Sequence, residues 1–273
     1  MTIQEQFGFI MDLPRVDFCG EGLHYIPRVQ YSHEHPRCNY NAIYKEGQSN
    51  MPVLIWVHGG GFTDEFNTFD YRPERTLADL AHAGFYVVCI EYRLRQHALF
   101  PACVVDCQNC VLYLREHAKE LNINPDRIAL WGESAGAYIV DMCASNFNDT
   151  EGADVQAVVS FYAPSDFALQ RKFENSGFAE EFLGIEKGCD SSLIIEASPI
   201  TYANKKNPPM LLLHGDVDEL VSYEQSVNYY NELVKAGNDA RLITVKGQGH
   251  GFFEGQNYYD EIIDFLKSKL MDS

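Results

Sequence analysis

One serine in this chain lies between two glycines at a spacing that suits nucleophilic chemistry, Gly132-Glu133-Ser134-Ala135-Gly136. Residues 127–131 before it form an apolar run with the length of a buried strand, and residues 138–143 after it favour a helix. A strand-to-helix turn this tight admits only small residues two positions before and after the serine. It holds the hydroxyl out of the sheet, where the N–H groups of the new helix also point. Ser134 is therefore the candidate nucleophile, and the flanking glycines favour this over a serine that only caps the helix.

A serine hydroxyl is a poor nucleophile at neutral pH and needs a neighbouring base. Among nine histidines, His250 is the candidate, because it follows the last predicted strand and precedes the last predicted helix. In a parallel sheet, that position lies at the same edge as the serine. His58 and His214 also stand at strand ends. We interpret His58 as orienting its glycine-rich loop and His214 as a strand-end residue bonded to the backbone.

A carboxylate that holds the base in one tautomer and stabilises its imidazolium form would complete the set. Asp218 is the first candidate, Asp216 the second, and Asp166, which follows an earlier predicted strand, the third. With Asp218 the order along the chain is Ser, Asp, His, which is the order in α/β-hydrolases.

The run His58-Gly59-Gly60-Gly61 follows another predicted strand, residues 52–57. Acyl transfer creates an oxyanion that backbone N–H donors must meet at hydrogen-bond distance. Glycine lets the backbone come that close. We interpret the run as a candidate oxyanion-binding loop, and the alternative is an ordinary glycine-rich turn.

Strands and helices alternate from residue 52 to the end, which predicts an α/β fold: a mostly parallel central sheet with helices on both faces. The sequence is expected to form one domain over residues 1–273. Residues 1–37 show little periodicity and are expected to form an arm. Residues 165–208 lack strand signals and carry Phe173, Phe178, Phe182 and Leu183, which favours an inserted helical lid. The expected strands are 38–45, 52–57, 85–92, 127–131, 157–163, 210–213 and 240–245, and the main helices are 73–83, 103–121, 223–235 and 258–270.

The formal net charge of −18 argues against nucleic acid and anionic membrane as partners. No run of 18 apolar residues suggests a membrane span, and the first residues lack a secretory signal, so a cytoplasmic site is expected. A small-molecule substrate is expected, and the sequence leaves open whether the chain forms a homodimer.

Eight cysteines are present, most of them in apolar runs, and free buried thiols are expected. Cys103, Cys107 and Cys110 share the spacing of an iron–sulfur motif in radical enzymes that use S-adenosylmethionine. A cluster needs thiolates on a flexible loop around iron, whereas these three recur at helical spacing on an apolar stripe. We therefore expect a core role, with no metal and no cofactor.

Taken together, the motifs resemble the hormone-sensitive-lipase-like esterases of the α/β-hydrolase fold, and most of all the compact bacterial branch with feruloyl and acetyl-xylan esterase domains. The resemblance covers about residues 40–270. It implies Ser134, Asp218 and His250 as the triad, with oxyanion donors from Gly60, Gly61 and Ala135. Ala137 departs from it where many members have a third glycine, and the arm and lid do not match a long-chain lipase cap. The shared segments are 58–62, 92–94, 100–102 with Asp106, 132–136, 197–200, 208–218 and 249–252.

The expected activity is therefore hydrolysis of small acyl esters, acetyl first, through an acyl-enzyme and without a cofactor. An arylformamidase or a small peptidase on the same fold is an alternative. A non-catalytic binding protein on a hydrolase scaffold is another, but such proteins usually lose a triad residue and none is missing here. Fold alone does not decide the substrate.

Overall fold

One eight-stranded sheet runs through the computed structural model, which describes residues 17–63, 74–173, 177–251 and 258–271. Its strand order is β1-β2-β4-β3-β5-β6-β7-β8. β1 and β2 are antiparallel, β2 pairs antiparallel with β4, and the remaining neighbours are parallel. The α/β class is confirmed. The strands are β1 Leu23–Gln30, β2 Asn39–Lys45, β3 Met51–Val57, β4 Tyr86–Ile90, β5 Ile123–Glu133, β6 Ala157–Phe161, β7 Met210–Gly215 and β8 Ala240–Val245.

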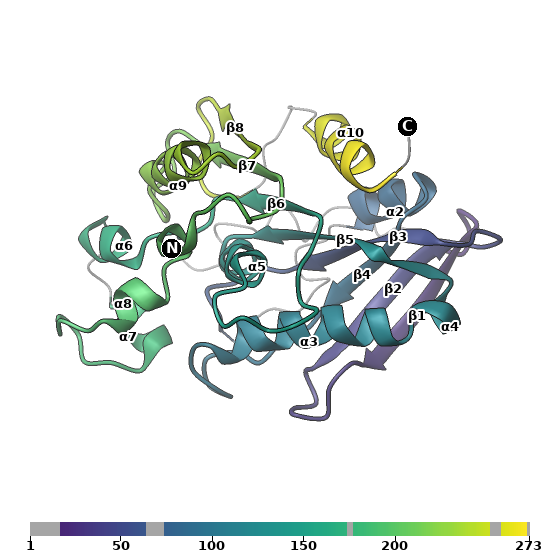
Figure 1. The fold of residues 1–273 in the computed structure, drawn as a ribbon, viewed down its shortest axis with the longest axis horizontal. Helices are drawn as coiled ribbons and strands as arrows, with labels where there is room; N and C mark the ends of the chain where they lie inside the picture. Colours follow the sequence, from purple (N-terminus) through teal and green to yellow (C-terminus); the bar gives the residue numbers. More distant parts are fainter. Residues whose placement is uncertain (1–16, 64–73, 174–176, 252–257, 272–273) are drawn as a thin grey trace.

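The central strands are buried on both faces, as their continuous apolar runs predict. Every residue of β3 is buried, and its side chains alternate between two core clusters. Ile55 belongs to one cluster and Trp56 to the other. Helices α3 (Ala102–Glu116), α5 (Ala135–Ser145) and α9 (Glu224–Lys235) cover the first cluster, and α2 (Glu74–His82) and α10 (Tyr259–Leu270) cover the second (Figure 1).

The expected helix 103–121 is two helices, because α3 ends at Glu116 and α4 (Ala118–Leu121) follows after His117. The cysteines of α3 lie in the core, and Cys103, Cys107 and Cys110 are at most 3% exposed. Burial raises the pKa of the Cys103 and Cys110 thiols, and a hydrogen bond with Cys143, followed by burial, raises the pKa of Cys107. Buried protonated thiols pack as small apolar groups, and all eight cysteines are free of disulfides.

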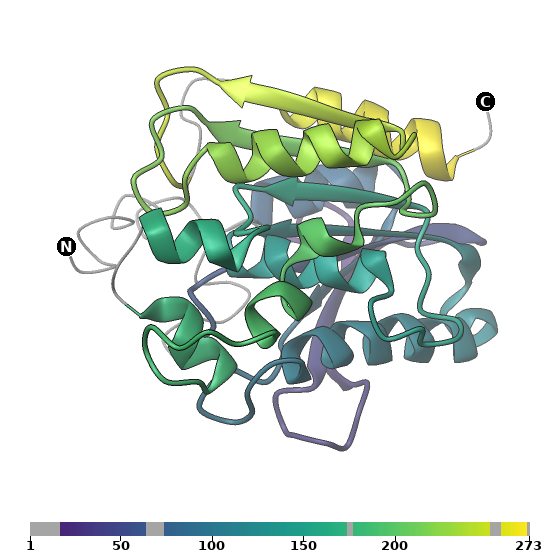
Figure 2. The ribbon, with the colours of Figure 1, turned by 60° about the vertical axis from the view of Figure 1, so that its left-hand side comes forward.

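The segment 165–208 is helical, as expected, with α6 (Phe167–Phe173), α7 (Phe178–Leu183), α8 (Leu193–Glu196) and the 3₁₀ helix η1 (Pro199–Tyr202). These green helices gather on the side of the molecule towards which the arrows of β7 and β8 point (Figure 2). The segment therefore lies on the side of the sheet where the parallel strands end.

The expected arm at residues 1–37 is in part wrong, because β1 lies within it and forms the edge of the sheet. Residues 1–16 lie outside the described part of the chain. The strand was missed because its pairing shifts register between Ile26 and Val29, so the sequence does not alternate cleanly. Pro27, which cannot donate to a ladder, is tolerated on an edge strand, and Arg28 has a positive φ of 52°.

Candidate active site

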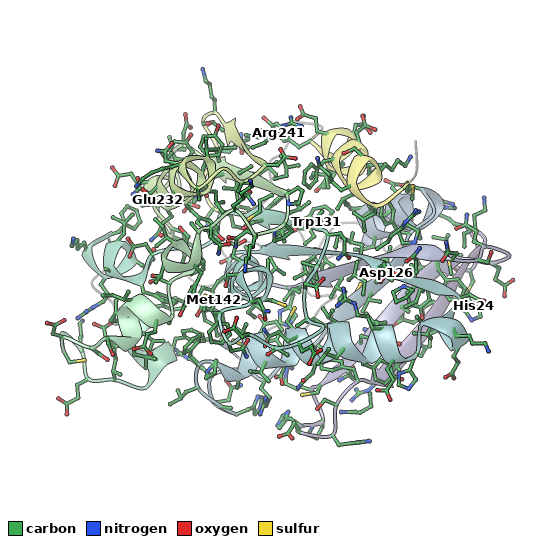
Figure 3. The ribbon with its side chains drawn as sticks, in the orientation of Figure 1. His24, Asp126, Trp131, Met142, Glu232 and Arg241 are labelled. Carbon is green, nitrogen blue, oxygen red and sulfur yellow. The ribbon has the colours of Figure 1, made fainter. Side chains whose placement is uncertain are left out.

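Ser134 occupies the turn between β5 and α5 with φ 54° and ψ −117°, a conformation that a non-glycine residue rarely adopts. The neighbouring glycines leave no room for a side chain. A Cβ at Gly132 would lie 2.3 Å from Gly136 O, and one at Gly136 would lie 2.1 Å from Val57 O. The serine side chain does not cap the helix. The strained turn instead turns its hydroxyl towards a histidine. Figure 3 shows Trp131, three residues before the serine, in the middle of the molecule.

The histidine is His250, whose Nε2 lies 2.9 Å from Ser134 Oγ. Its Nδ1 lies 2.7 Å from Asp218 Oδ2. Because a carboxylate only accepts hydrogen bonds, Nδ1 carries the proton and Nε2 can accept the serine O–H. Ser134, His250 and Asp218 follow β5, β8 and β7, which run parallel, so their loops meet at one edge of the sheet. The geometry is that of a nucleophile, a base and an acid in series.

The two other aspartates that the sequence offered have different partners. Asp216 is exposed, and its Oδ1 accepts a hydrogen bond from Gly247 N at 2.6 Å. Asp166 stands at the start of α6, where its Oδ1 accepts the amides of Ala168 at 2.8 Å and Leu169 at 3.1 Å. Asp216 therefore holds the loop that contains His250, and Asp166 accepts hydrogen bonds from free amides at the start of α6.

Asp218 is buried, at 7% exposure, and four donors surround its carboxylate. Oδ1 accepts the amides of Leu220 and Val221, at 2.8 and 2.9 Å. Oδ2 accepts from His250 and, at 3.1 Å, faces Nε2 of His214. Burial alone would raise the pKa of Asp218, but the hydrogen bonds from His214 and His250 outweigh it and lower the pKa well below its usual range. The carboxylate is therefore ionised near neutral pH.

The contact between His214 and Asp218 was not predicted from the sequence. His214 does bond to the backbone as expected, since Nε2 lies 2.9 Å from Val221 O. It also reaches Asp218, four residues later, which the predicted strand-end role did not include. His214 lies near the end of β7, and Asp218 lies in the turn that follows. A spacing of four residues predicts a side-chain contact in a helix, but it predicts none across the end of a strand.

The glycine-rich loop lies directly against the serine. A Cβ at Gly59 would lie 2.7 Å from Glu133 O and 3.2 Å from Ser134 Cβ. His58 Nδ1 lies 2.8 Å from Gly59 O, in line with the expected orienting role. Gly60 and Gly61 have φ of 103° and 59°. In the described part of the chain, the amides of Gly60, Gly61 and Ala135 donate to no backbone carbonyl.

A buried carboxyl that the sequence interpretation did not consider adjoins this site. Glu133 Oε2 accepts the hydroxyl of Tyr162 at 3.1 Å, and the Tyr162 ring lies 4.6 Å from the His250 ring. Burial raises the pKa of Glu133 to about 7, although hydrogen bonds from Tyr162 and Trp56 oppose the rise. Tyr162 itself has a positive φ of 43°. The contact between Glu133 and Tyr162 has no signal in the sequence, because any residue can stand between the glycine and the serine in the motif.

An aromatic cluster joins the segment 165–208 to the glycine-rich loop. Phe62 stacks on Phe182 with ring centroids 3.9 Å apart and on Phe178 at 5.8 Å. Phe178 is half-buried and comes within 3.5 Å of the position of a Cβ on Gly61. Phe182 and Leu183 are buried, whereas Phe173 is 44% exposed. Phe178 is thus the half-buried member of this set, and it lies beside the glycine-rich loop.

Among the residues that the structure describes, no cluster of His, Cys, Asp and Glu has the geometry of a metal site. No helix in the described ranges is both long enough and apolar enough to cross a membrane.

Comparison with known proteins places the chain among esterases. The sequence model of the BD-FAE family matches residues 42–233. Esterase LipQ of Mycobacterium tuberculosis is 30% identical over 68% of this chain and 46% of its own length. An arylesterase of Saccharolobus solfataricus is 26% identical over 82% of this chain and 76% of its own length. The chain spans about half the length of the Mycobacterium tuberculosis esterases LipQ, LipM and LipC.

Solved structures share the fold. A truncated carbohydrate esterase from gut microbiota superposes with a TM-score of 0.79 at 24% identity, over 91% of this chain and 97% of its own. An acetyl ester-xyloside bifunctional hydrolase from Caldicellulosiruptor lactoaceticus gives 0.75 at 20% identity, over 94% and 97%. At 20–24% identity, these structures show only that the fold is shared. The match to the family model is the evidence for membership of the family. The chain belongs to the BD-FAE family of α/β-hydrolase esterases.

Proposed function

We propose that the chain is a serine carboxylic-ester hydrolase that acts on esters of small acyl groups, acetyl foremost. The observation that carries the proposal is the series Ser134–His250–Asp218, with contacts of 2.9 and 2.7 Å. His250 Nε2 takes the proton of Ser134 as Oγ attacks the ester carbonyl. The imidazolium that forms lies against an ionised Asp218. The same proton then passes to the leaving alcohol.

In the second half of the reaction, His250 takes a proton from water as its oxygen attacks the acyl-Ser134 ester. His250 then returns the proton to Ser134 Oγ as the bond between Oγ and the acyl group breaks and the acid is released. The carbonyl oxygen becomes negative in both halves. The amides of Gly60, Gly61 and Ala135 are the proposed donors to it, which places the oxyanion between the glycine-rich loop and the start of α5. None of these steps needs a metal or a cofactor.

The preference for small acyl groups rests on the lid proposed at residues 165–208. Phe178 stands beside Gly61, where it would limit the length of an acyl chain. Each methylene that fits gains about 0.8 kcal/mol of burial, whereas one that displaces packed side chains costs roughly 1–3 kcal/mol. Two structural neighbours, a carbohydrate esterase and an acetyl ester-xyloside hydrolase, make acetylated sugars the first natural substrates to test.

The test is a series of nitrophenyl esters from acetyl to decanoyl, with kcat/KM measured for each. We expect a maximum between acetyl and butyryl, and Phe178→Ala should move it to longer chains. Phe173→Ala, on an exposed ring of the same segment, is the matched control and should leave the profile in place. A maximum at eight carbons or beyond in the unaltered protein would contradict the small-acyl proposal. No ester hydrolysis at all would favour a non-catalytic binding protein.

A further inference from the structure

His214, at the carboxyl side of β7, has a fully buried ring whose two nitrogens face three partners. Nε2 lies 3.1 Å from Asp218 Oδ2 and 2.9 Å from Val221 O. Nδ1 lies 2.7 Å from Ser226 Oγ, at the start of α9. The proposed reaction steps use none of these contacts, although one of them reaches the proposed acid.

The partners determine where the ring proton lies. A carboxylate oxygen and a carbonyl oxygen only accept hydrogen bonds, so a nitrogen that faces both must carry a proton. A hydroxyl can donate, so Ser226 can satisfy an unprotonated Nδ1. A neutral imidazole has one N–H. The neutral ring that satisfies all three partners is therefore protonated at Nε2, and the Ser226 O–H donates to Nδ1.

This N–H completes the set of donors around the Asp218 carboxylate. The two amides that follow the turn hold Oδ1, and His250 and His214 share Oδ2. Rotation of the carboxylate away from His250 would break the hydrogen bond from His214 as well. Without His214, His250 would be the only side chain among the described residues that holds Oδ2, and His250 is the group that must change its charge during the reaction.

We propose that His214, protonated at Nε2 and fixed by Ser226, is a positioning residue that holds the Asp218 carboxylate in line with His250. The proposal rests on the proposed function, because it assigns Asp218 and His250 their catalytic roles.

The test compares His214→Leu, which removes the donor, with His214→Gln, whose amide can return an N–H towards Asp218. Loss of one hydrogen bond to a charged group should lower kcat/KM for nitrophenyl acetate by roughly ten- to a hundredfold, mostly in kcat. His214→Gln should recover most of that loss. His117→Leu is the matched control, since this half-buried ring also contacts a carbonyl, Tyr113 O at 2.8 Å, but near the start of β5. It should stay within twofold of the unaltered enzyme.

A pH profile separates positioning from general destabilisation. Among the described residues, the ionisable side chains around His250 are those of Asp218, His214, Tyr162 and Glu133. A carboxylate with one donor fewer stabilises the imidazolium more strongly. The acid limb of kcat/KM should therefore move to higher pH in His214→Leu and return in His214→Gln. A variant that only unfolds would lose amplitude without moving this limb.

Nitrogen–proton NMR of the unaltered protein gives a second readout that does not depend on a variant folding. His214 should show a proton on Nε2 and none on Nδ1. A proton on Nδ1 alone, or a His214→Leu enzyme within twofold of the original with an unmoved acid limb, would overturn the inference. If the unaltered protein hydrolyses no ester, the proposed function is wrong. The NMR measurement still shows which nitrogen of His214 carries the proton.

Discussion

Ser134 Oγ and His250 Nε2 lie 2.9 Å apart, although 116 positions separate the two residues in the chain. They follow β5 and β8, and β6 and β7 lie between these strands in the sheet. The loop after β8 therefore crosses the end of β7. A Cβ on Gly215, the last residue of β7, would lie 2.1 Å from Gln248 O and 2.8 Å from Gly249 O. The absence of a side chain at Gly215 allows the loop to bring His250 to the serine.

Gly215→Ala should accordingly disable the enzyme by displacing the loop rather than by removing a reacting group. A displacement of about 1 Å can cost on the order of a hundredfold in rate, so we expect a loss of that size in kcat/KM. Gly249→Ala is the matched comparison, because among the described residues its Cβ would meet only Val217 O, at 3.9 Å. Equal activities of the two alanine variants would show that, in solution, the loop after β8 does not pack closely against Gly215.

Asp218→Asn should cost on the order of ten-thousand-fold in kcat, as the same change does in other serine hydrolases. The neutral amide no longer stabilises the imidazolium of His250. Asp216→Asn keeps an acceptor for Gly247 N and should stay within a few fold, and Asp166→Asn should do the same. Steady-state rates on nitrophenyl acetate rank the three. A larger loss in Asp216→Asn or Asp166→Asn would assign the acid elsewhere.

The fold and the order of the site could be predicted from the sequence because both depend on local signals. Apolar runs give the parallel strands, and the residues after each run must meet at one edge of the sheet. What the sequence missed depends on contacts without a local signal. β1 was missed because its register shift interrupts the alternation near Arg28. His214 and Glu133 were missed because their contacts with Asp218 and Tyr162 depend on turn geometry and burial.

Glu133 makes the stability of the protein depend on pH in a definite direction. Its pKa in the folded protein is raised from 4.5 to about 7. A raised carboxyl pKa favours the protonated folded state, so stability is lost as the pH rises from the unfolded value through the folded one. The shift corresponds to about 3 kcal/mol in the free energy of unfolding.

Glu133→Gln keeps a neutral acceptor for Tyr162 and removes this titration. Relative to the variant, the unaltered protein should lose on the order of 2–3 kcal/mol of unfolding free energy between pH 4 and pH 8. Asp218, whose lowered pKa destabilises the fold at acid pH, affects both proteins alike and cancels in the difference. Denaturant titrations at the two pH values measure it. A difference that does not change with pH would mean that folding does not raise the pKa of Glu133.

The most direct test of the account is to find which atom carries the covalent intermediate. The protein should react with one equivalent of a fluorophosphonate, and peptide mass spectrometry should place the adduct on Ser134. Ser134→Ala should neither label nor turn over, with kcat reduced about a million-fold by analogy with other serine hydrolases. An adduct on another residue, or ester hydrolysis that persists in Ser134→Ala, would contradict the account.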